Sequence, residues 1–181
     1  AIKLAISNLE LRKSLQNQAI KDPLTALYNR RHFSDIILRE LNRALRYEIP
    51  FSVAMIDLDH FKSINDRFGH DSGDKVLTEL GRILREKIRN SDIAFRFGGE
   101  EFILLLPETE IRGAVECMEH IRKELENRKI HHNGKYLGII TMSVGVAQYP
   151  LHGKDEESLI RAADNALYKA KSAGRNNVQT A

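Results

Sequence analysis

The sequence predicts an α/β fold of the α+β type, with a ferredoxin-like or palm-type βαββαβ core and a helical extension at its N-terminus. Between residues 51 and 147, apolar runs of strand length and runs with helical spacing follow the order strand, helix, strand, strand, helix, strand. This order is typical of a split βαβ arrangement, whose central sheet contains antiparallel pairs and is flanked by helices. The length of 181 residues and the hydrophobic fraction of 42% suit one globular domain.

The first twenty residues precede this core and carry an imperfect heptad pattern, with Ile2, Ile6 and Leu9 on one stripe. We expect residues 1–21 to form a signalling or stalk helix that ends at Asp22-Pro23, and residues 22–181 to form the catalytic domain. A helix packed on its own domain is an equal alternative, because so few heptads cannot establish a coiled coil.

The remaining elements follow from periodicity and from glycine and proline positions. A first helix ends before Pro50, a buried strand follows, and Gly98-Gly99 joins the next two strands as a hairpin. The predicted helices cover residues 31–47, 76–88, 111–125 and 159–170, and the predicted strands cover residues 51–57, 93–97, 101–106, 137–147 and 177–180.

This topology predicts where acidic residues meet. A right-handed crossover makes the strands 51–57 and 93–97 parallel, so that the end of the first strand and the tip of the hairpin lie at one edge of the sheet. The strand leaving the hairpin then lies beside the first strand, which brings Asp57 close to Glu100 and Glu101. Asp59 lies at the same strand end.

Like charges held this close repel one another, so the cluster either titrates upward or binds cations. Hard oxygen ligands suit magnesium that bridges the phosphates of a substrate. The alternative, that these acids are solvated turn residues, is weakened by their shared edge and by the two glycines. Gly98 and Gly99 could serve only as a turn, but their missing side chains would also let a purine approach the backbone. No P-loop sequence is present.

Charge and composition exclude several classes. The net charge is +3, but Lys and Arg are spread among 25 acidic residues, so nucleic-acid binding is not indicated. The single cysteine, Cys117, fits a packing role in a reduced, cytoplasmic protein. The longest apolar stretch, residues 137–147, is about half of a membrane span, so we expect no membrane contact. Because the chain opens with Ala1 in a helical pattern, we expect an upstream sensor domain in a longer parent protein.

Four segments resemble the motifs of the GGDEF family. Residues 61–74 resemble its second signature, and Gly98-Gly99-Glu100-Glu101-Phe102 resembles its eponymous motif in the Glu variant. Residues 22–31 are similar to its opening motif, and residues 166–176 to its closing motif. The four motifs occur in the family's order between residues 22 and 176, which is far more specific than any one of them.

The resemblance implies a diguanylate cyclase, which condenses two GTP molecules into cyclic di-GMP and two pyrophosphates across a homodimer. It implies that Asp57, Glu100 and Glu101 are catalytic, and that they bind two Mg²⁺ (or Mn²⁺) ions together with the carbonyl of Leu58. Asn65 and Asp74 would read guanine, because an amide and a carboxylate complement its acceptor and donors. The full set implied to bind substrate is Phe61, Lys62, Asn65, Asp74, Gly98, Gly99, Lys171 and Arg175.

Arg89 and Asp92 match, by their distance from Gly98, the family's Arg-x-x-Asp site for inhibition by cyclic di-GMP. The alternative is an ordinary surface pair. Two other functions stay open: an inactive module that only binds cyclic di-GMP through these two residues, and a cyclase of the same palm-like fold that makes a single-nucleotide product.

Overall fold

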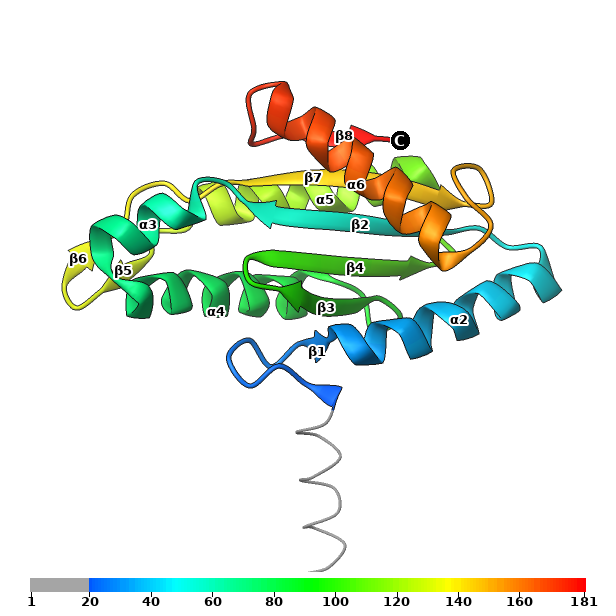
Figure 1. Cartoon of the computed structure of the whole chain (residues 1–181), viewed down its shortest axis with the longest axis horizontal. Coiled ribbons are helices and arrows are strands. Elements are labelled where there is room, and N and C mark those ends of the chain that lie inside the picture. Colours follow the sequence, from blue (N-terminus) through cyan, green and yellow to red (C-terminus); the bar gives the residue numbers. More distant parts are fainter. Residues whose placement is uncertain (1–19) are drawn as a thin grey trace, which may run out of the picture.

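A computed structural model describes residues 20–181, and its centre is a six-stranded mixed sheet in the order β1-β3-β4-β2-β7-β8 (Figure 1). The predicted stalk helix, apart from its last two residues, lies outside this range. The strands are β1 (Tyr28–Asn29), β2 (Phe51–Leu58), β3 (Ile93–Gly98), β4 (Glu101–Pro107), β7 (Met142–Tyr149) and β8 (Val178–Thr180); β5 (His131–His132) and β6 (Lys135–Tyr136) form a separate small hairpin.

The predicted βαββαβ order is confirmed. Strand β2 lies antiparallel to both β4 and β7, and β3 lies antiparallel to β4, so β2 and β3 run in the same direction. Strands β1 and β8 add one parallel partner at each edge of the sheet. The strands β1, β5 and β6 were not predicted, because two residues are too few to show a periodic pattern.

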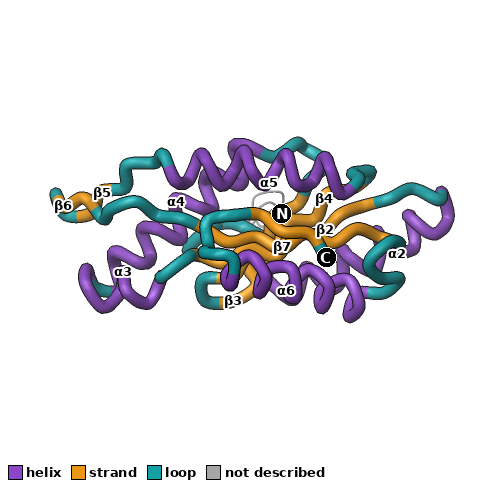
Figure 2. The backbone as a smooth tube through the Cα atoms, turned by 90° about the horizontal axis from the view of Figure 1, so that it is seen from above, coloured by secondary structure: helices purple, strands orange, loops and turns teal. Residues whose placement is uncertain are grey.

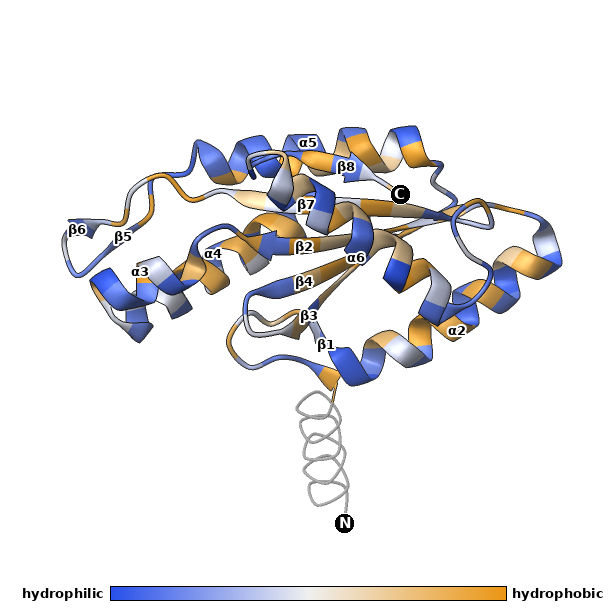
Figure 3. Cartoon of the chain, turned by 45° about the horizontal axis from the view of Figure 1, so that its top comes forward, coloured by the Kyte–Doolittle hydropathy of each residue, from blue (hydrophilic) through white to orange (hydrophobic). Residues whose placement is uncertain are grey.

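Helices cover both faces of the sheet, α4 and α5 on one and α2 and α6 on the other (Figure 2). Successive side chains of β2 point to opposite faces of the sheet, so each face has its own hydrophobic core. Ala54, Ile56 and Leu58 lie in the core beneath α4 and α5, and Val53 and Met55 lie in the core beneath α2 and α6. Figure 3 shows the resulting apolar strands beneath helices with polar outer faces. The helices are α2 (Arg30–Tyr47), α3 (Phe61–Phe68), α4 (His70–Lys87), α5 (Ile111–Glu126) and α6 (Glu156–Ser172).

Helix α6 lies unusually close to β7, and Gly145 is the reason. A β-carbon at Gly145 would come within 2.1 Å of the backbone oxygen of Ala163 and of the backbone nitrogen of Leu167. Any larger residue would therefore push α6 away from the sheet. Across residues 20–181, no helix combines the length and the apolar character needed to cross a bilayer.

Three predicted boundaries were wrong, and the helix α3 was not predicted. The helix predicted for residues 76–88 already begins at His70, because α3 ends before Gly69, which has a φ of +87°, and α4 starts directly after it. The strand predicted for residues 137–147 begins only at Met142, because Gly138 has a φ of +89° and the apolar Leu137 and Ile140 are buried without joining the sheet. The apolar residues before Met142 therefore indicated burial in the core, but not a strand. Helix α6 begins before the predicted residue 159, because Asp155 and Ser158 form a capping box ahead of the first apolar position.

Candidate functional site

The acidic site forms where β2 ends beside the start of β4. Asp57 and Glu101 are directly opposite each other in this antiparallel pair, so their side chains project from the same face of the sheet. The backbone N–H of Leu58 donates to the carbonyl of Glu100 at 3.4 Å. The predicted proximity of Asp57 to the Glu100-Glu101 tip is therefore confirmed.

Both opposed carboxylates titrate above their ordinary range. Burial is the main cause that raises the pKa of Asp57, and the nearby Asp59 charge raises it further, against the opposing effect of Lys171. Partial desolvation raises the pKa of Glu101, and the charges of Asp57 and Asp164 add to it. Burial thus makes the ionised forms of this pair unfavourable, and an added cation would stabilise them.

Cations from the end of α6 approach the same site. The Nζ of Lys171 lies 3.0 Å from Oδ2 of Asp57, and the charge of Arg175 is a smaller influence that opposes the rise in the pKa of Asp57. These residues are separated from Asp57 by more than a hundred positions in the sequence. The two cations of the closing motif are thereby brought to the acidic edge.

Asp59, although two residues from Asp57, belongs to a different environment. It is buried, and its carboxylate accepts hydrogen bonds from Oγ1 of Thr141 at 2.8 Å and Oγ of Ser143 at 2.7 Å. The backbone N–H of Asn176 donates a third bond at 3.0 Å. Its oxygens are therefore committed to protein donors, and the acidic cluster expected at this strand end does not include it as a free carboxylate.

The hairpin tip is held by Arg96, which was not predicted from the sequence. Its Nε and Nη2 donate to the carbonyl of Gly99 at 3.0 and 2.9 Å, and its Nη1 pairs with Asp22 at 3.1 Å. The turn lies at Gly99, with a φ of +48°, and Glu100, one residue later than predicted, because β3 is irregular between Arg96 and Gly98. A lone arginine in a strand gives no signal by itself.

A second group of predicted residues lies on α3 and α4. The Oδ1 of Asn65 is buried without a hydrogen-bond partner among the described residues, and it lies against Gly73, where a β-carbon would come within 1.9 Å. Asp74 follows Gly73 at the surface, so the amide and the carboxylate occupy neighbouring helices. Phe61 packs into the core and its ring also borders Gly73, whereas Lys62 is exposed. An unpartnered buried polar atom is typical of a ligand site.

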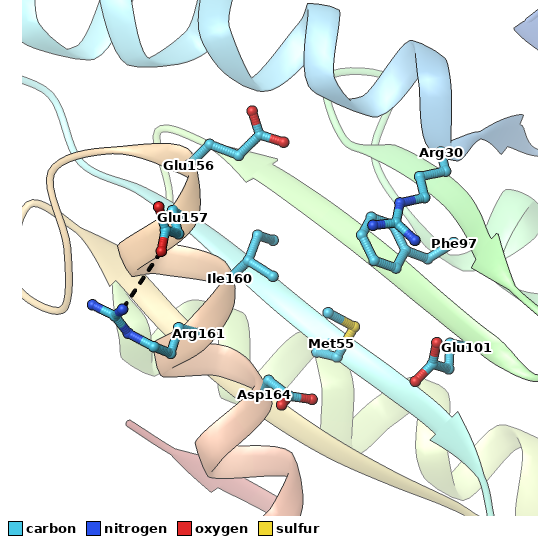
Figure 4. Close-up of a pocket in the computed structure, with 9 residues that line it drawn as sticks. All are labelled: Arg30, Met55, Phe97, Glu101, Glu156, Glu157, Ile160, Arg161 and Asp164. Carbon is cyan, nitrogen blue, oxygen red and sulfur yellow. Dashed lines mark ion pairs between the residues drawn. The ribbon is translucent and has the colours of Figure 1, made fainter.

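A pocket of about 620 Å³ extends from Glu101 between α2 and α6 (Figure 4). Met55 and Ile160 contribute apolar surface to it, and Arg30 lies 4.4 Å from the ring centre of Phe97. No motif predicted this pocket, since its lining residues come from distant helices and strands.

The predicted inhibitory pair lies on the connection between α4 and β3. Asp92 is buried, and its Oδ2 accepts a hydrogen bond from the backbone N–H of Arg89 at 3.0 Å. The side chain of Arg89 is exposed, and both residues line two pockets of about 300 and 230 Å³. The backbone contact fixes the spacing of the pair and leaves the guanidinium available to solvent.

The oxygen donors at this edge of the sheet are of the kind that magnesium binds. Within residues 20–181, no three His, Cys, Asp or Glu side chains gather as a ready metal site. Magnesium is usually held by one or two carboxylates together with substrate phosphates, and Asp57, Glu101 and the carbonyl of Leu58 are donors of this hard oxygen class. The residues therefore fit an ion that shares its ligands with a bound nucleotide.

Comparisons with known proteins agree with these features. A model of the family described as "Diguanylate cyclase, GGDEF domain" matches residues 19–177. Diguanylate cyclase A of Treponema denticola is 37% identical over 97% of this chain and 47% of its own length, and diguanylate cyclase DosC of Escherichia coli is 42% identical over 87% and 34%. The chain thus spans less than half of these relatives.

Among solved structures, the coiled coil and GGDEF domain of DgcB from Caulobacter crescentus, in complex with c-di-GMP, superimposes with a TM-score of 0.88. It shares 31% sequence identity, over 99% of this chain and 98% of that one. The family match covers most of the chain and includes the opposed Asp57 and Glu101, the glycine hairpin and the cations Lys171 and Arg175. The chain therefore belongs to the GGDEF domain family.

Proposed function

We propose that this chain is the catalytic domain of a diguanylate cyclase, which converts two GTP molecules into cyclic di-GMP and two pyrophosphates. The observation that carries the proposal is the opposition of Asp57 and Glu101 on one face of the sheet, with Lys171 at 3.0 Å from Asp57. Carboxylates beside cations suit a site where a phosphate anion is bound and a hydroxyl is activated.

In this reaction the 3′-hydroxyl of one GTP attacks the α-phosphate of the other, and pyrophosphate leaves; the step then repeats in the opposite sense. Lys171 and Arg175 bind the phosphates and offset the charge that develops on the leaving pyrophosphate. Asp57, Glu100, Glu101 and the Leu58 carbonyl would hold two Mg²⁺ (or Mn²⁺) ions, which when bound lower the pKa of the attacking hydroxyl and neutralise phosphate charge.

Asn65 and Asp74 bind the guanine. Because Oδ1 of Asn65 is buried against Gly73, the amide N–H₂ is the group left to donate to a guanine acceptor, and the Asp74 carboxylate accepts from the guanine N–H groups. Phe61, Lys62 and the backbone at Gly98-Gly99 complete the nucleotide site. Adenine presents a donor where guanine presents its carbonyl, so this arrangement favours GTP over ATP.

Each chain supplies one such site, so catalysis takes place in a homodimer with the two sites facing each other. Arg89 and Asp92 form the product-inhibition site, where the exposed guanidinium binds a phosphate or guanine of cyclic di-GMP. The relative in complex with c-di-GMP supports recognition of this product within the family. The helix predicted for residues 1–21 would set the distance between the two partners.

Incubation with GTP or ATP plus magnesium, followed by chromatography of the products, tests the proposal. Cyclic di-GMP from GTP alone is the expected result. Formation of a single-nucleotide cyclic product would identify the palm-fold cyclase of the other type. Binding of cyclic di-GMP with no turnover would identify the inactive effector module.

A further inference from the structure

The turn that follows α6 is held in a conformation that its sequence does not favour. Gly174, Arg175 and Asn176 have successive φ angles of +107°, +65° and +46°. Only glycine enters this left-handed region without a steric cost, and runs of such residues are rare. Arg175 and Asn176 therefore keep this geometry because contacts outside the turn impose it.

Asn176 makes those contacts with its backbone N–H and with both polar groups of its side chain. Its backbone N–H donates to Oδ2 of Asp59 at 3.0 Å. Its side-chain Oδ1 accepts from Nη1 of Arg122 at 2.7 Å, and its Nδ2 donates to Oε1 of Glu126 at 2.7 Å. We call these four residues, Asp59, Arg122, Glu126 and Asn176, the clasp.

The partners of Asn176 are themselves fixed. Asp59 is tied to Thr141 and Ser143, at the start of β7. Arg122 is buried in α5 and pairs with Glu126 at 3.0 Å. The clasp thus joins the turn to two rigid parts of the molecule, the end of β2 and the helix α5, which packs on the opposite face of the sheet from α6.

The turn contains one of the two site cations, Arg175, and directly follows the helix end that contains the other, Lys171. Lys171, in the last turn of α6, has its Nζ 3.0 Å from Asp57, and Arg175 lies inside the turn, directly before Asn176. We propose that Asn176 is a positioning residue: through the clasp it holds Arg175 and the end of α6 where the two cations bind the phosphates of the nucleotide. This inference rests on the proposed function and assigns α5 a part in it.

The chain provides a closely matched test on α5. Glu119 and Glu126 both pair with Arg122 at 3.0 Å, and both side chains are 35% exposed, but only Glu126 bonds Asn176. Glu126→Ala removes the bond from Asn176 together with one ion pair of Arg122. Glu119→Ala is its control, because it removes an ion pair of Arg122 but no bond to Asn176. Asn176→Gly keeps the left-handed φ and the N–H bond to Asp59 but removes both side-chain bonds.

The measurement is the affinity for inorganic pyrophosphate, by calorimetric titration of wild type and of the three variants. Asn176→Gly and Glu126→Ala should each bind pyrophosphate roughly tenfold more weakly, the scale of one charge-assisted hydrogen bond, while Glu119→Ala stays within about twofold. Guanosine affinity should be unchanged in all of them, because the guanine site lies on α3 and α4.

Equal pyrophosphate affinity in all four proteins would overturn the inference, and so would an equal loss in Glu119→Ala and Glu126→Ala. A parallel loss of guanosine affinity would show that the clasp is merely structural. Absence of pyrophosphate binding to the wild type would also refute it. Because these titrations need no turnover, failure of the wild type to make cyclic di-GMP would refute the proposed function and leave the clasp to be decided separately.

Discussion

Asp57 and Asp59 lie two residues apart at one strand end, yet their surroundings give them different roles. Asp57 faces Glu101 and Lys171, and burial raises the pKa of its carboxyl. The ionised form of Asp57 is therefore less favourable in the folded protein than in water. Asp59 accepts three hydrogen bonds and is satisfied within the protein. A carboxylate that is poorly compensated is available for chemistry, whereas a compensated one stabilises structure.

This difference predicts opposite effects of the same substitution. Asp57→Asn should lower turnover about a hundredfold or more and leave the free energy of unfolding at pH 7 unchanged or higher, because a raised folded-state pKa makes the ionised carboxyl destabilising at that pH. Asp59→Asn should lower the free energy of unfolding by about 1–3 kcal/mol. Urea unfolding and an activity assay check both. A large stability loss in Asp57→Asn would contradict this account.

Gly73 gives a second prediction at the scale of one residue. Alanine suits its helical backbone, but the added β-carbon would lie 1.9 Å from Oδ1 of Asn65 and must displace that amide. Gly73→Ala should raise KM for GTP roughly tenfold while the melting temperature changes little. Gly113→Ala, in α5, is the control, because its β-carbon would meet only Cγ2 of Thr109 at 3.3 Å. Similar KM values in the two variants would be evidence against a role of the Asn65 amide in binding.

At the scale of elements, the site depends on hydrogen bonds that connect the hairpin between β3 and β4 to the segment before β1. Arg96 in β3 connects the carbonyl of Gly99 at the hairpin tip to Asp22, which precedes β1. Asp22 also accepts from the backbone N–H and Oγ1 of Thr25 at 2.8 and 2.7 Å. Through Arg96, the segment at Asp22 and the hairpin that carries Glu100 and Glu101 are therefore held in a fixed relative position.

The Asp22 contacts predict a pH dependence of stability. Burial acts to raise the pKa of Asp22, but the bonds from Thr25 and Arg96 outweigh it, and the folded-state pKa lies below 3.8. The carboxylate therefore stabilises the fold above pH 3.8, and this contribution is lost as the pH falls through the lower folded-state value. Asp22→Asn should cost about 1 kcal/mol at pH 7 and much less near pH 3, as measured by urea unfolding. A cost independent of pH would assign the effect to shape rather than charge.

At the scale of the whole molecule, two cores on opposite faces of one sheet meet at a single functional edge. The α2–α6 face provides Lys171, and the α4–α5 face provides the support for Asn176. Within residues 20–181, each copy thus presents the opposed pair of Asp57 and Glu101 with the neighbouring cations Lys171 and Arg175, whereas the proposed reaction joins two nucleotides. A single copy is half of the proposed catalytic unit.

The requirement for two copies predicts that specific activity depends on protein concentration. Activity per chain should rise with concentration until the dimer predominates and then level off, because dimer formation follows mass action. Initial rates over a dilution series, compared with the mass distribution from sedimentation, provide the measurement. Constant activity per chain at concentrations where the protein sediments as a monomer would exclude the facing-dimer mechanism.

Periodicity and topology were enough to predict the acidic pair from the sequence. The alternation of Val53 and Met55 with Ala54 and Ile56 marks β2 as buried on both sides, and the order of elements predicts β4 beside it. Asp57 follows this apolar run and Glu101 follows the glycine hairpin, so their meeting needs no information beyond strand order. The family motifs then added expectations for Lys171, Arg175, Asn65 and Asp74.

Only the tertiary structure decided which polar groups satisfy one another. Asp59 meets Thr141 and Asn176, which are 82 and 117 positions away, and Arg96 meets Asp22 across 74 positions. Hydrophobic periodicity records which face of an element is buried, because burial acts on every residue of that face. A hydrogen bond depends on the geometry of two particular groups, so the roles of Asp59, Arg96 and Asn176 emerged only when the chain was folded.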